Sequence, residues 1–388
     1  MISIVSRVSP RPRVSSAGFS LIEMMIAVVL GALVVAGLIN VLMANRQAYH
    51  LQEANNYNQE NMRFAMDRIG WSLRQASYWS GVHANQIIGT PAVGGTSGSC
   101  NQAWALDAKD AVFGYDGTSS GTGFPVKDCV DAANYVGGSD VLVVRYADAD
   151  AVPWSATTVP TLNSKQIYLE ARAGTYGVLF AGNYLKQLPF TDAAGAPQQG
   201  SYIYPYAIEM YYLRPCSDLG SATDCSAASD GGHPIPTLMR MRLDSTGTLI
   251  NEPVVEGVEQ LQFEYGLRNP ADPNKSPTPV QYRDANGMAA GDWANVIAVR
   301  IGYVLRSQTR DTALPHPFDS QTTDVTNVKY PLRLSSDCEY SIAADGTAQI
   351  VSGCTGFNTS TSLGDKPQQY TRAQMNAVVQ LRNLIRQI

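Results

Sequence analysis

Charged side chains are scarce in this sequence, and basic ones never cluster. Only 16% of the 388 residues are Asp, Glu, Lys or Arg, and the formal net charge is −5 at pH 7. Binding to nucleic acid draws much of its affinity from a patch of Lys and Arg side chains that neutralises phosphates. The sequence offers no such patch, so we expect no nucleic-acid partner.

The sequence also lacks the usual motifs of catalytic and metal sites. It contains neither an H-E-x-x-H zinc motif nor a P-loop. Histidine is rare, and none lies at zinc-finger spacing from a cysteine pair; the four are His50, His83, His233 and His316. We therefore predict that the protein is not an enzyme and holds no metal ion or other cofactor.

The six cysteines never form a C-x-x-C pair. They fall instead into three locally spaced pairs, a pattern typical of disulfides in an oxidising compartment. Pairing nearest neighbours closes the shortest loops at the least entropic cost, and it predicts the disulfides Cys100–Cys129, Cys216–Cys225 and Cys338–Cys354. A reduced cytosolic set or a zinc site is the alternative.

One long apolar run lies near the N-terminus. It extends from Phe19 to Ala44, and its only strong interruptions are Ser20, Glu23 and Asn40. About 20 apolar residues, at a rise of about 1.5 Å per residue, cross the hydrocarbon core of a bilayer. The run therefore predicts a transmembrane helix.

Basic residues on the two sides of this run are unequal. Arg7, Arg11 and Arg13 precede it, whereas Arg46 alone directly follows it. Because positive charge stays on the cytoplasmic side of a membrane, we expect a single-pass topology with the N-terminus in the cytoplasm. The cysteines then lie on the oxidising side, in agreement with their pairing into disulfides.

A secretory signal peptide is the alternative, but its apolar region is only about 7 to 15 residues long. Here the run continues into an amphipathic pattern, in which apolar residues recur every three or four positions: Met62, Ala65, Met66, Ile69, Leu73 and Ala76. We predict one continuous helix from Phe19 to about Ser77, with Gly81 as its stop signal. Half of this helix must find protein partners outside the membrane.

Glu23 lies near the start of the apolar run. An ionised side chain at the middle of a bilayer costs about 2.5 to 3.5 kcal/mol on insertion scales. A cost of that size calls for a partner. The alternative is a solvated Glu23 near the headgroups, favoured by the dipole at the helix N-terminus.

Residues 17–25, Ala-Gly-Phe-Ser-Leu-Ile-Glu-Met-Met, resemble the processing motif of type IV prepilins without a departure. The resemblance implies that a prepilin peptidase cuts between Gly18 and Phe19 and then methylates the new Phe19 amine. It also implies that Glu23 pairs with the Phe19 amine of a neighbouring subunit during assembly. Two opposite charges buried in an apolar filament core favour one register over others.

Beyond Gly81, clusters of Gly, Ser, Pro and Asn separate short segments rich in β-branched and aromatic residues. These segments predict strands at residues 140–146, 166–170, 203–213, 237–244, 258–265 and 294–305. An apolar stripe predicts a C-terminal helix from Thr371 to Ile385. The expected fold class is α+β and type IV pilin-like. A long N-terminal α-helix, with a transmembrane half and an amphipathic half, packs on a mainly antiparallel β-sheet head with a C-terminal helix.

Four downstream segments are similar to the large minor pilins of the PilW type: residues 139–145, 258–266, 297–301 and 379–383. The similarity implies a minor pilin subunit that helps to initiate or cap a type IV pilus. Expected partners are the prepilin peptidase, the major pilin, other minor pilins, the inner-membrane assembly platform and, as a further candidate, a tip adhesin. A minor pseudopilin of a type II secretion system is the nearest alternative, and a membrane-anchored exported enzyme or binding protein is another.

These inferences divide the chain into three parts. We expect residues 1–18 to form a cleaved leader peptide, residues 19–80 the transmembrane and assembly helix, and residues 81–388 a periplasmic or extracellular β-rich head. The resemblance implies that the subunit lies in the inner membrane before assembly, with its head in the periplasm, and in the extracellular pilus afterwards.

Overall fold

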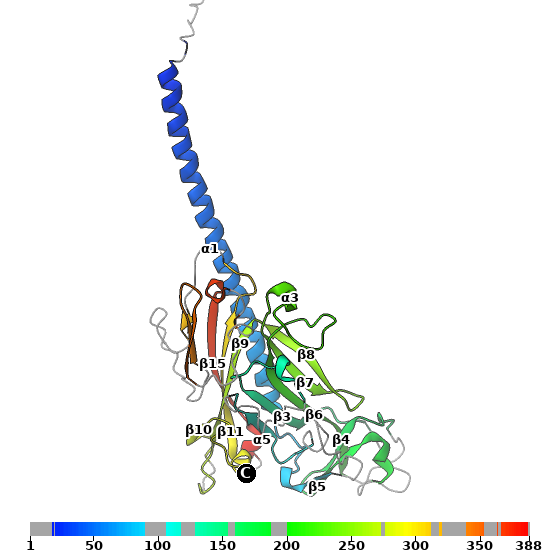
Figure 1. Cartoon of the computed structure of the whole chain (residues 1–388). Helices are drawn as coiled ribbons and strands as arrows, with labels where there is room; N and C mark the ends of the chain where they lie inside the picture. The colour runs from blue at the N-terminus through cyan, green and yellow to red at the C-terminus, as the bar shows by residue number, and fades with distance from the viewer. Residues whose placement is uncertain are drawn as a thin grey trace, which may run out of the picture. The chain divides into compact units, whose positions relative to one another are not determined.

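The computed structural model describes residues 18, 20–89, 106–117, 129–153, 160–187, 200–272, 276–311, 318–319, 339–352, 363 and 366–386. The chain divides into two compact units, residues 1–52 and residues 53–388. The long helix α1, blue in Figure 1, has residues in both units, and the β-strands belong to the second unit.

Helix α1 extends from Leu21 to Gln75, close to the predicted range. In the first unit its apolar side chains are exposed on all sides, among them Ile22, Leu30 and Leu38. A helix that is apolar all round is typical of a membrane span or of the core of a large protein. Exposure along its whole circumference excludes a core helix in this unit.

In the second unit the same helix buries one face. Ala65, Ile69 and Leu73 are fully buried, and Met62 and Met66 pack against the same core cluster. The predicted apolar stripe of the helix is thus confirmed. Most of the energy that holds this part of α1 comes from burial of that stripe rather than from helix propensity.

The helix ends because the chain enters the left-handed region directly after it. Ser77 has a φ of 60°, and its N–H donates to the carbonyl of Arg145 at 3.1 Å. Ser80 and Gly81 also have positive φ angles, 53° and 81°. The predicted stop signal Gly81 therefore belongs to the turn, while the helix itself ends at Gln75.

The larger sheet of the head has eight strands in the order β1-β5-β4-β6-β3-β2, with β7 paired to β6 and β8 paired to β7. β1 is parallel to β5, and the other pairs are antiparallel. The strands are β1 (Ile87–Gly89), β2 (Val112–Tyr115), β3 (Val141–Ala147), β4 (Ile167–Arg172), β5 (Tyr176–Ala181), β6 (Ser201–Arg214), β7 (Thr237–Leu243) and β8 (Leu249–Glu256).

A four-stranded antiparallel sheet has the order β10-β9-β11-β15, and a three-stranded sheet has the order β12-β13-β14. Asp140 joins the larger sheet to the four-stranded one: its N–H donates to the carbonyl of Leu261, and its carboxylate accepts the N–H of Phe263, both at 2.8 Å. The strands are β9 (Val258–Leu267), β10 (Gln281–Arg283), β11 (Val296–Arg306), β12 (Phe318–Asp319), β13 (Glu339–Ile342), β14 (Ala348–Ser352) and β15 (Arg372–Gln380).

Short helical turns connect the strands. They are η1 (Ala84–Gln86), η4 (Ala132–Asn134), η5 (Gly182–Gln187), α3 (Ser229–Gly232), η6 (Trp293–Asn295), η7 (Pro367–Gln369) and α5 (Arg382–Arg386). The main core contains the buried stripe of α1 together with side chains of β3, β9 and β11, and a second apolar cluster includes alternate residues of β3, β4 and β6. The larger sheet is therefore buried on both faces around β3.

All six predicted strands are present, at β3, β4, β6, β7, β9 and β11. The long N-terminal helix and the mainly antiparallel head are confirmed with them.

The predicted C-terminal helix is wrong over most of its length. Arg372–Gln380 forms strand β15, which pairs antiparallel with β11, and only Arg382–Arg386 is helical. On its other side β11 pairs with β9. Without β15, a row of N–H and C=O groups on β11 would lack partners within the sheet. That requirement outweighs the helical spacing of the apolar residues in this segment.

Candidate functional site

The sequence predicts processing at Gly18 and Phe19 and an assembly role for Glu23, at the start of the long helix. Gly18 and Ser20 precede the helix, Glu23 lies in its first turn, and Phe19 lies outside the described residues. The Ser20 N–H donates to Glu23 Oε2 at 3.3 Å, and the Glu23 N–H donates to Ser20 Oγ at 3.5 Å. This reciprocal pair has the geometry of a capping box.

Across the part of the chain that the structure describes, α1 is the one helix that is long and apolar enough to cross a membrane. Its 18-residue apolar window has a mean hydropathy of 2.7 and is 0% buried. Length and composition of this kind also fit a signal sequence or a core helix. The continuation of α1 into the core of the second unit separates it from a simple signal sequence.

Two large aromatic side chains are exposed on the part of α1 that belongs to the second unit. Phe64 is 55% exposed and Trp71 is 42% exposed. They lie about two helical turns apart, on one side of the helix. The Arg68 guanidinium lies 5.3 Å from the centroid of the Trp71 ring, and Tyr146 contacts that ring edge-on at 5.9 Å. This Phe64–Trp71 face offers apolar area for packing against another chain.

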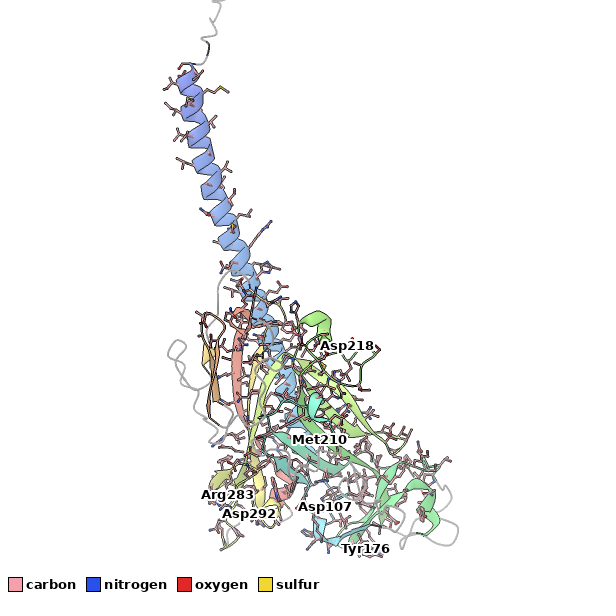
Figure 2. All side chains as sticks on the ribbon, viewed as in Figure 1. Asp107, Tyr176, Met210, Asp218, Arg283 and Asp292 are labelled. Carbon is pink, nitrogen blue, oxygen red and sulfur yellow. A yellow bond between two sulfur atoms is a disulfide. The ribbon has the colours of Figure 1, made fainter. Side chains whose placement is uncertain are left out.

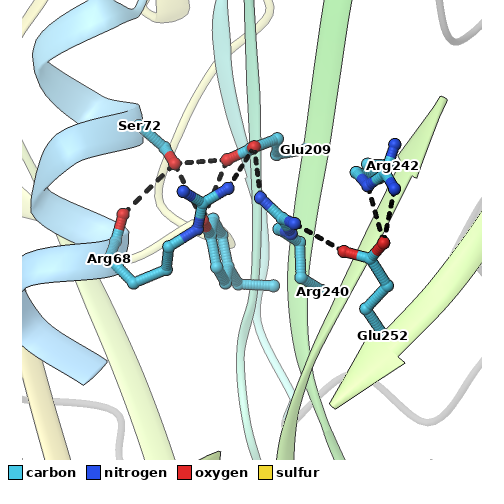
Figure 3. Close-up of polar contacts among 7 residues, drawn as sticks. Arg68, Ser72, Glu209, Arg240, Arg242 and Glu252 are labelled. Carbon is cyan, nitrogen blue, oxygen red and sulfur yellow. Dashed lines mark hydrogen bonds and ion pairs between the residues drawn. The ribbon is translucent and has the colours of Figure 1, made fainter. Parts of the chain in front are cut away.

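A charge network fastens the buried side of α1 to the larger sheet (Figure 3). Glu209 of β6 is buried, and its Oε1 lies 2.9 Å from Arg68 Nη2 of α1 and 2.9 Å from Arg240 Nη1 of β7. Its Oε2 accepts the Tyr211 hydroxyl at 2.9 Å and the Ser72 hydroxyl. Four donors therefore satisfy this one carboxylate.

The network continues to the next strand. Glu252 of β8 lies 2.5 Å from Arg240 Nη2 and 2.5 Å from Arg242 Nη2. Burial, followed by the charge of Glu209, raises the pKa of Tyr211, so its hydroxyl stays protonated and donates. Sequence reasoning did not identify the network, because its members come from α1, β6, β7 and β8.

A second buried ion pair links two strands of the four-stranded sheet, β9 and β15, which lie on either side of β11. Glu259 of β9 accepts both arms of the Arg372 guanidinium, Nε at 2.6 Å and Nη2 at 2.8 Å. Arg306 Nη1 lies 3.5 Å from the same carboxylate and donates to the Leu363 carbonyl at 2.6 Å. The Arg306 guanidinium also lies 4.3 Å from the centroid of the Tyr370 ring. A two-armed pair of this kind fixes both position and orientation.

The C-terminal end of α1 is capped by a residue far along the chain. The side-chain amide of Asn383 lies 3.1 Å from the carbonyl oxygen of Arg74, 3.3 Å from that of Gln75 and 3.2 Å from that of Ala76. The last carbonyls of a helix have no partner within it. Asn383, which closes the PilW-like segment 379–383, shares its two N–H groups among these carbonyls from α5.

One of the three predicted disulfides lies wholly within the described residues. The structure joins Cys216 to Cys225, as the spacing predicts. Cys129 is also disulfide-bonded. The remaining cysteines, Cys100, Cys338 and Cys354, lie outside the described residues, so the other two pairings stay predictions.

Two polar side chains order the loop that this disulfide closes. The Asp230 carboxylate accepts the N–H groups of Ser217, Asp218 and Ile235 at 2.8 to 2.9 Å. Burial alone would raise the pKa of Asp230, but these hydrogen bonds lower it. Asn134 accepts the Cys225 N–H at 3.0 Å. The loop is thus held at both of its ends.

Glu170 of β4 is a buried carboxylate in apolar surroundings. It is 0% exposed, and its cross-strand neighbours are Val178 and Ile203. A hydrogen bond from the Ser201 side chain acts to lower its pKa, but burial is the larger effect. Burial raises the pKa of Glu170 from its ordinary 4.5 to about 8. The side chain is therefore mostly protonated at neutral pH.

This burial predicts a head that weakens as the pH rises. The folded state holds the Glu170 proton more tightly than the unfolded chain, so stability falls between about pH 4.5 and about pH 8. Glu170→Gln, which is neutral at every pH, should remove that slope and melt several degrees above the wild type near pH 9. Thermal melting in detergent across this range checks it, with Asp150→Asn, an exposed loop residue, as control. An unchanged slope in Glu170→Gln would contradict the assignment.

Within the described ranges, no group of three or more His, Cys, Asp or Glu side chains is placed to hold a metal ion. Carboxylates in the loop after β10 make local contacts instead. Asp292 lies 2.8 Å from Arg283 Nη1 (Figure 2), and Asp284 accepts the Gly287 N–H at 2.7 Å. These contacts stabilise the loop.

Comparison with known proteins gives matches at both ends of the chain. Residues 13–39 match the prokaryotic N-terminal methylation motif, and residues 224–383 match the family of type IV pilus-assembly protein W, PilW. No curated protein sequence matches the chain. Among solved structures, the type IV-like pilin TTHA1219 from Thermus thermophilus is similar over 84% of this chain and 96% of that chain, with 10% sequence identity and a TM-score of 0.29.

Proposed function

Because this chain is a type IV pilin-like protein with a PilW-family segment at residues 224–383, we propose that it is a minor pilin that helps to initiate or cap a pilus. The observation that carries the proposal is the presence of two independent matches on one chain. The methylation motif lies at the start of α1, and the PilW segment covers much of the head. A chance prepilin-like motif on an unrelated exported enzyme would not bring the second match with it.

In this proposal a prepilin peptidase removes residues 1–18, and Phe19 becomes the methylated N-terminal residue. The apolar part of α1 then stays in the inner membrane until the subunit enters the growing filament. Glu23 pairs with the Phe19 amine of a neighbouring subunit, because two opposite charges in an apolar core stabilise one register and penalise others.

The rest of α1 contributes a second surface to assembly. Ala65, Ile69 and Leu73 are used by the head's own core, whereas Phe64 and Trp71 remain exposed. Burial of large aromatic side chains is a major source of binding energy at interfaces. We assign the Phe64–Trp71 face to contacts with neighbouring pilins.

The size of the head supports a place at the tip of the filament. The β-rich part occupies residues 81–388, so a head of this size at every position along a shaft would meet steric conflict. The proposed partners are the major pilin, other minor pilins, the inner-membrane assembly platform and a tip adhesin. The head then lies in the periplasm before assembly and outside the cell afterwards.

The proposal is tested first by intact-mass and N-terminal analysis of the protein from membranes, with and without the prepilin peptidase. We expect a methylated Phe19 N-terminus in the wild type and an uncut leader without the peptidase. An intact Met1 in both samples, or cleavage beyond Ala44, would contradict it.

Glu23→Ala tests the assembly step separately. The variant should be processed normally, because the cleavage site is unchanged, but its recovery in sheared filaments should fall at least about tenfold, since it leaves a buried amine unpaired. Asp150→Ala, which removes an exposed carboxylate of the head, is the control.

Gold labelling of the head distinguishes tip from shaft, and dense labelling along the shaft would exclude the tip placement.

A further inference from the structure

The first turn of α1 contains a contact that the pairing role of Glu23 does not require. Glu23 Oε2 accepts the N–H of Ser20 from its own chain at 3.3 Å, and Ser20 Oγ accepts the N–H of Glu23 at 3.5 Å. Both side chains thus bond to the backbone of the other residue, three positions away. Within one subunit, the Glu23 carboxylate is therefore already hydrogen-bonded at the start of its own helix.

This contact satisfies backbone groups that would otherwise stay open. The first N–H groups of a helix have no acceptor within it, and Ser is among the preferred residues at the position before the first turn. In an apolar segment that cannot rely on water, each satisfied N–H matters more. The dipole at the helix N-terminus also favours a carboxylate at this place.

We propose that Ser20 is a positioning residue for assembly: it caps α1 and holds the Glu23 carboxylate in one conformation at the N-terminus of the helix before a neighbouring subunit arrives. The proposal rests on the proposed function, in which Glu23 meets the Phe19 amine of that neighbour. An acceptor that is already ordered loses less side-chain entropy on pairing than one that must first be fixed.

The contact is compatible with processing at Gly18. Cleavage between Gly18 and Phe19 leaves the Phe19–Ser20 peptide bond intact, so the N–H of Ser20 remains an amide donor in the mature chain. The new amine of Phe19 then lies one residue before the cap. Ser20 therefore has the same two bonds available before and after the leader is removed.

Three variants separate the cap from the charge. Ser20→Ala removes Oγ and leaves Glu23 charged, Ser20→Thr keeps a hydroxyl cap, and Glu23→Gln keeps an acceptor that also completes a capping box but removes the charge. Each is made in the full-length chain, and intact mass shows first that processing and methylation are unchanged. Two measurements follow: hydrogen exchange of the first-turn amides of processed protein in lipid nanodiscs, and recovery in sheared filaments.

In Ser20→Ala, hydrogen exchange of the first-turn amides should be about fivefold faster, which corresponds to the loss of about 1 kcal/mol of capping free energy. Its recovery in filaments should fall several-fold, and Ser20→Thr should restore both measurements. Glu23→Gln should keep the slow exchange yet lose filament recovery.

Unchanged exchange in Ser20→Ala would overturn the cap. Faster exchange with wild-type filament recovery would overturn the positioning role. If instead Glu23→Gln enters filaments as well as the wild type does, the charge-pairing part of the proposed function fails, and the exchange data still decide whether Ser20 caps the helix.

Discussion

Glu209→Ala is expected to destabilise the head by about 3 to 5 kcal/mol, the cost of removing one partner from a buried charge pair. The variant leaves Arg68 and Arg240 without their common carboxylate, and it removes the charged acceptor of the Ser72 and Tyr211 hydroxyls. Chemical denaturation of the detergent-solubilised protein, followed by tryptophan fluorescence, measures the loss.

Glu252→Ala is the matched control at the outer end of the same network. Its side chain is 29% exposed, so water compensates Arg240 and Arg242, and the expected loss is about 1 kcal/mol or less. Glu209→Gln keeps the shape of the side chain and should fall between the two. Equal losses in Glu209→Ala and Glu252→Ala would show that burial of Glu209 does not decide the energy.

Gly114→Ala is expected to destabilise the head by a comparable amount, for a steric reason. A Cβ at this position of β2 would overlap the hydroxyl and ring of Tyr265. Tyr265 is fully buried and packs edge-on against Trp293 at 4.8 Å between ring centroids, so the ring has no free volume into which to move. We expect a loss of about 3 kcal/mol or more, at the upper end of overpacking effects.

Gly89→Ala provides the comparison for this prediction. Gly89 also lies in a strand, but a Cβ there meets no atom within 4 Å, so the change should alter the melting temperature little. Tyr265→Ala removes the overlapping ring, so adding Gly114→Ala to that variant should cost much less stability than adding it to the wild type. If Gly114→Ala and Gly89→Ala have the same melting temperature, the predicted overlap with Tyr265 is wrong.

The elements that were predictable from the sequence are those with a strong local pattern. Residues 21–43 of α1 are almost uniformly apolar, and the stripe from Met62 to Ala76 keeps a three- and four-residue spacing. The strands β3, β6 and β11 are rich in β-branched and aromatic residues, which favour strands. For each of these, local preference and tertiary environment agree.

The elements that escaped prediction depend on neighbours. β15, with the sequence Arg-Ala-Gln-Met-Asn-Ala-Val-Val-Gln, contains good helix formers, yet it is a strand because β11 needs a second partner. β8 contains Pro253, which argues against a central strand but is tolerated where only one side of the strand is paired. Spacing along the chain does not report such pairings.

The candidate site divides in the same way. One short motif contains Gly18, Phe19 and Glu23, so the sequence alone was enough to select them as candidate site residues. Their roles are part of the proposed function. The sequence also contains a signal for the contact of Ser20 with Glu23, namely a Ser-x-x-Glu capping signature before an apolar run. The Glu209 network and the Asn383 cap were not predictable, because each joins residues more than 100 positions apart.

The cap at the C-terminal end of α1 has a consequence in time. Asn383 is synthesised 309 residues after Arg74, whose carbonyl it meets, and translation at about 5 to 20 residues per second makes that delay about 15 to 60 seconds. Throughout this interval the last carbonyls of α1 lack the Asn383 amide as a donor, although the apolar half of the helix has already been synthesised. A chain that ends before α5 lacks Asn383 and leaves this end of α1 uncapped. The cap on α1 can therefore form only after Asn383 has been translated.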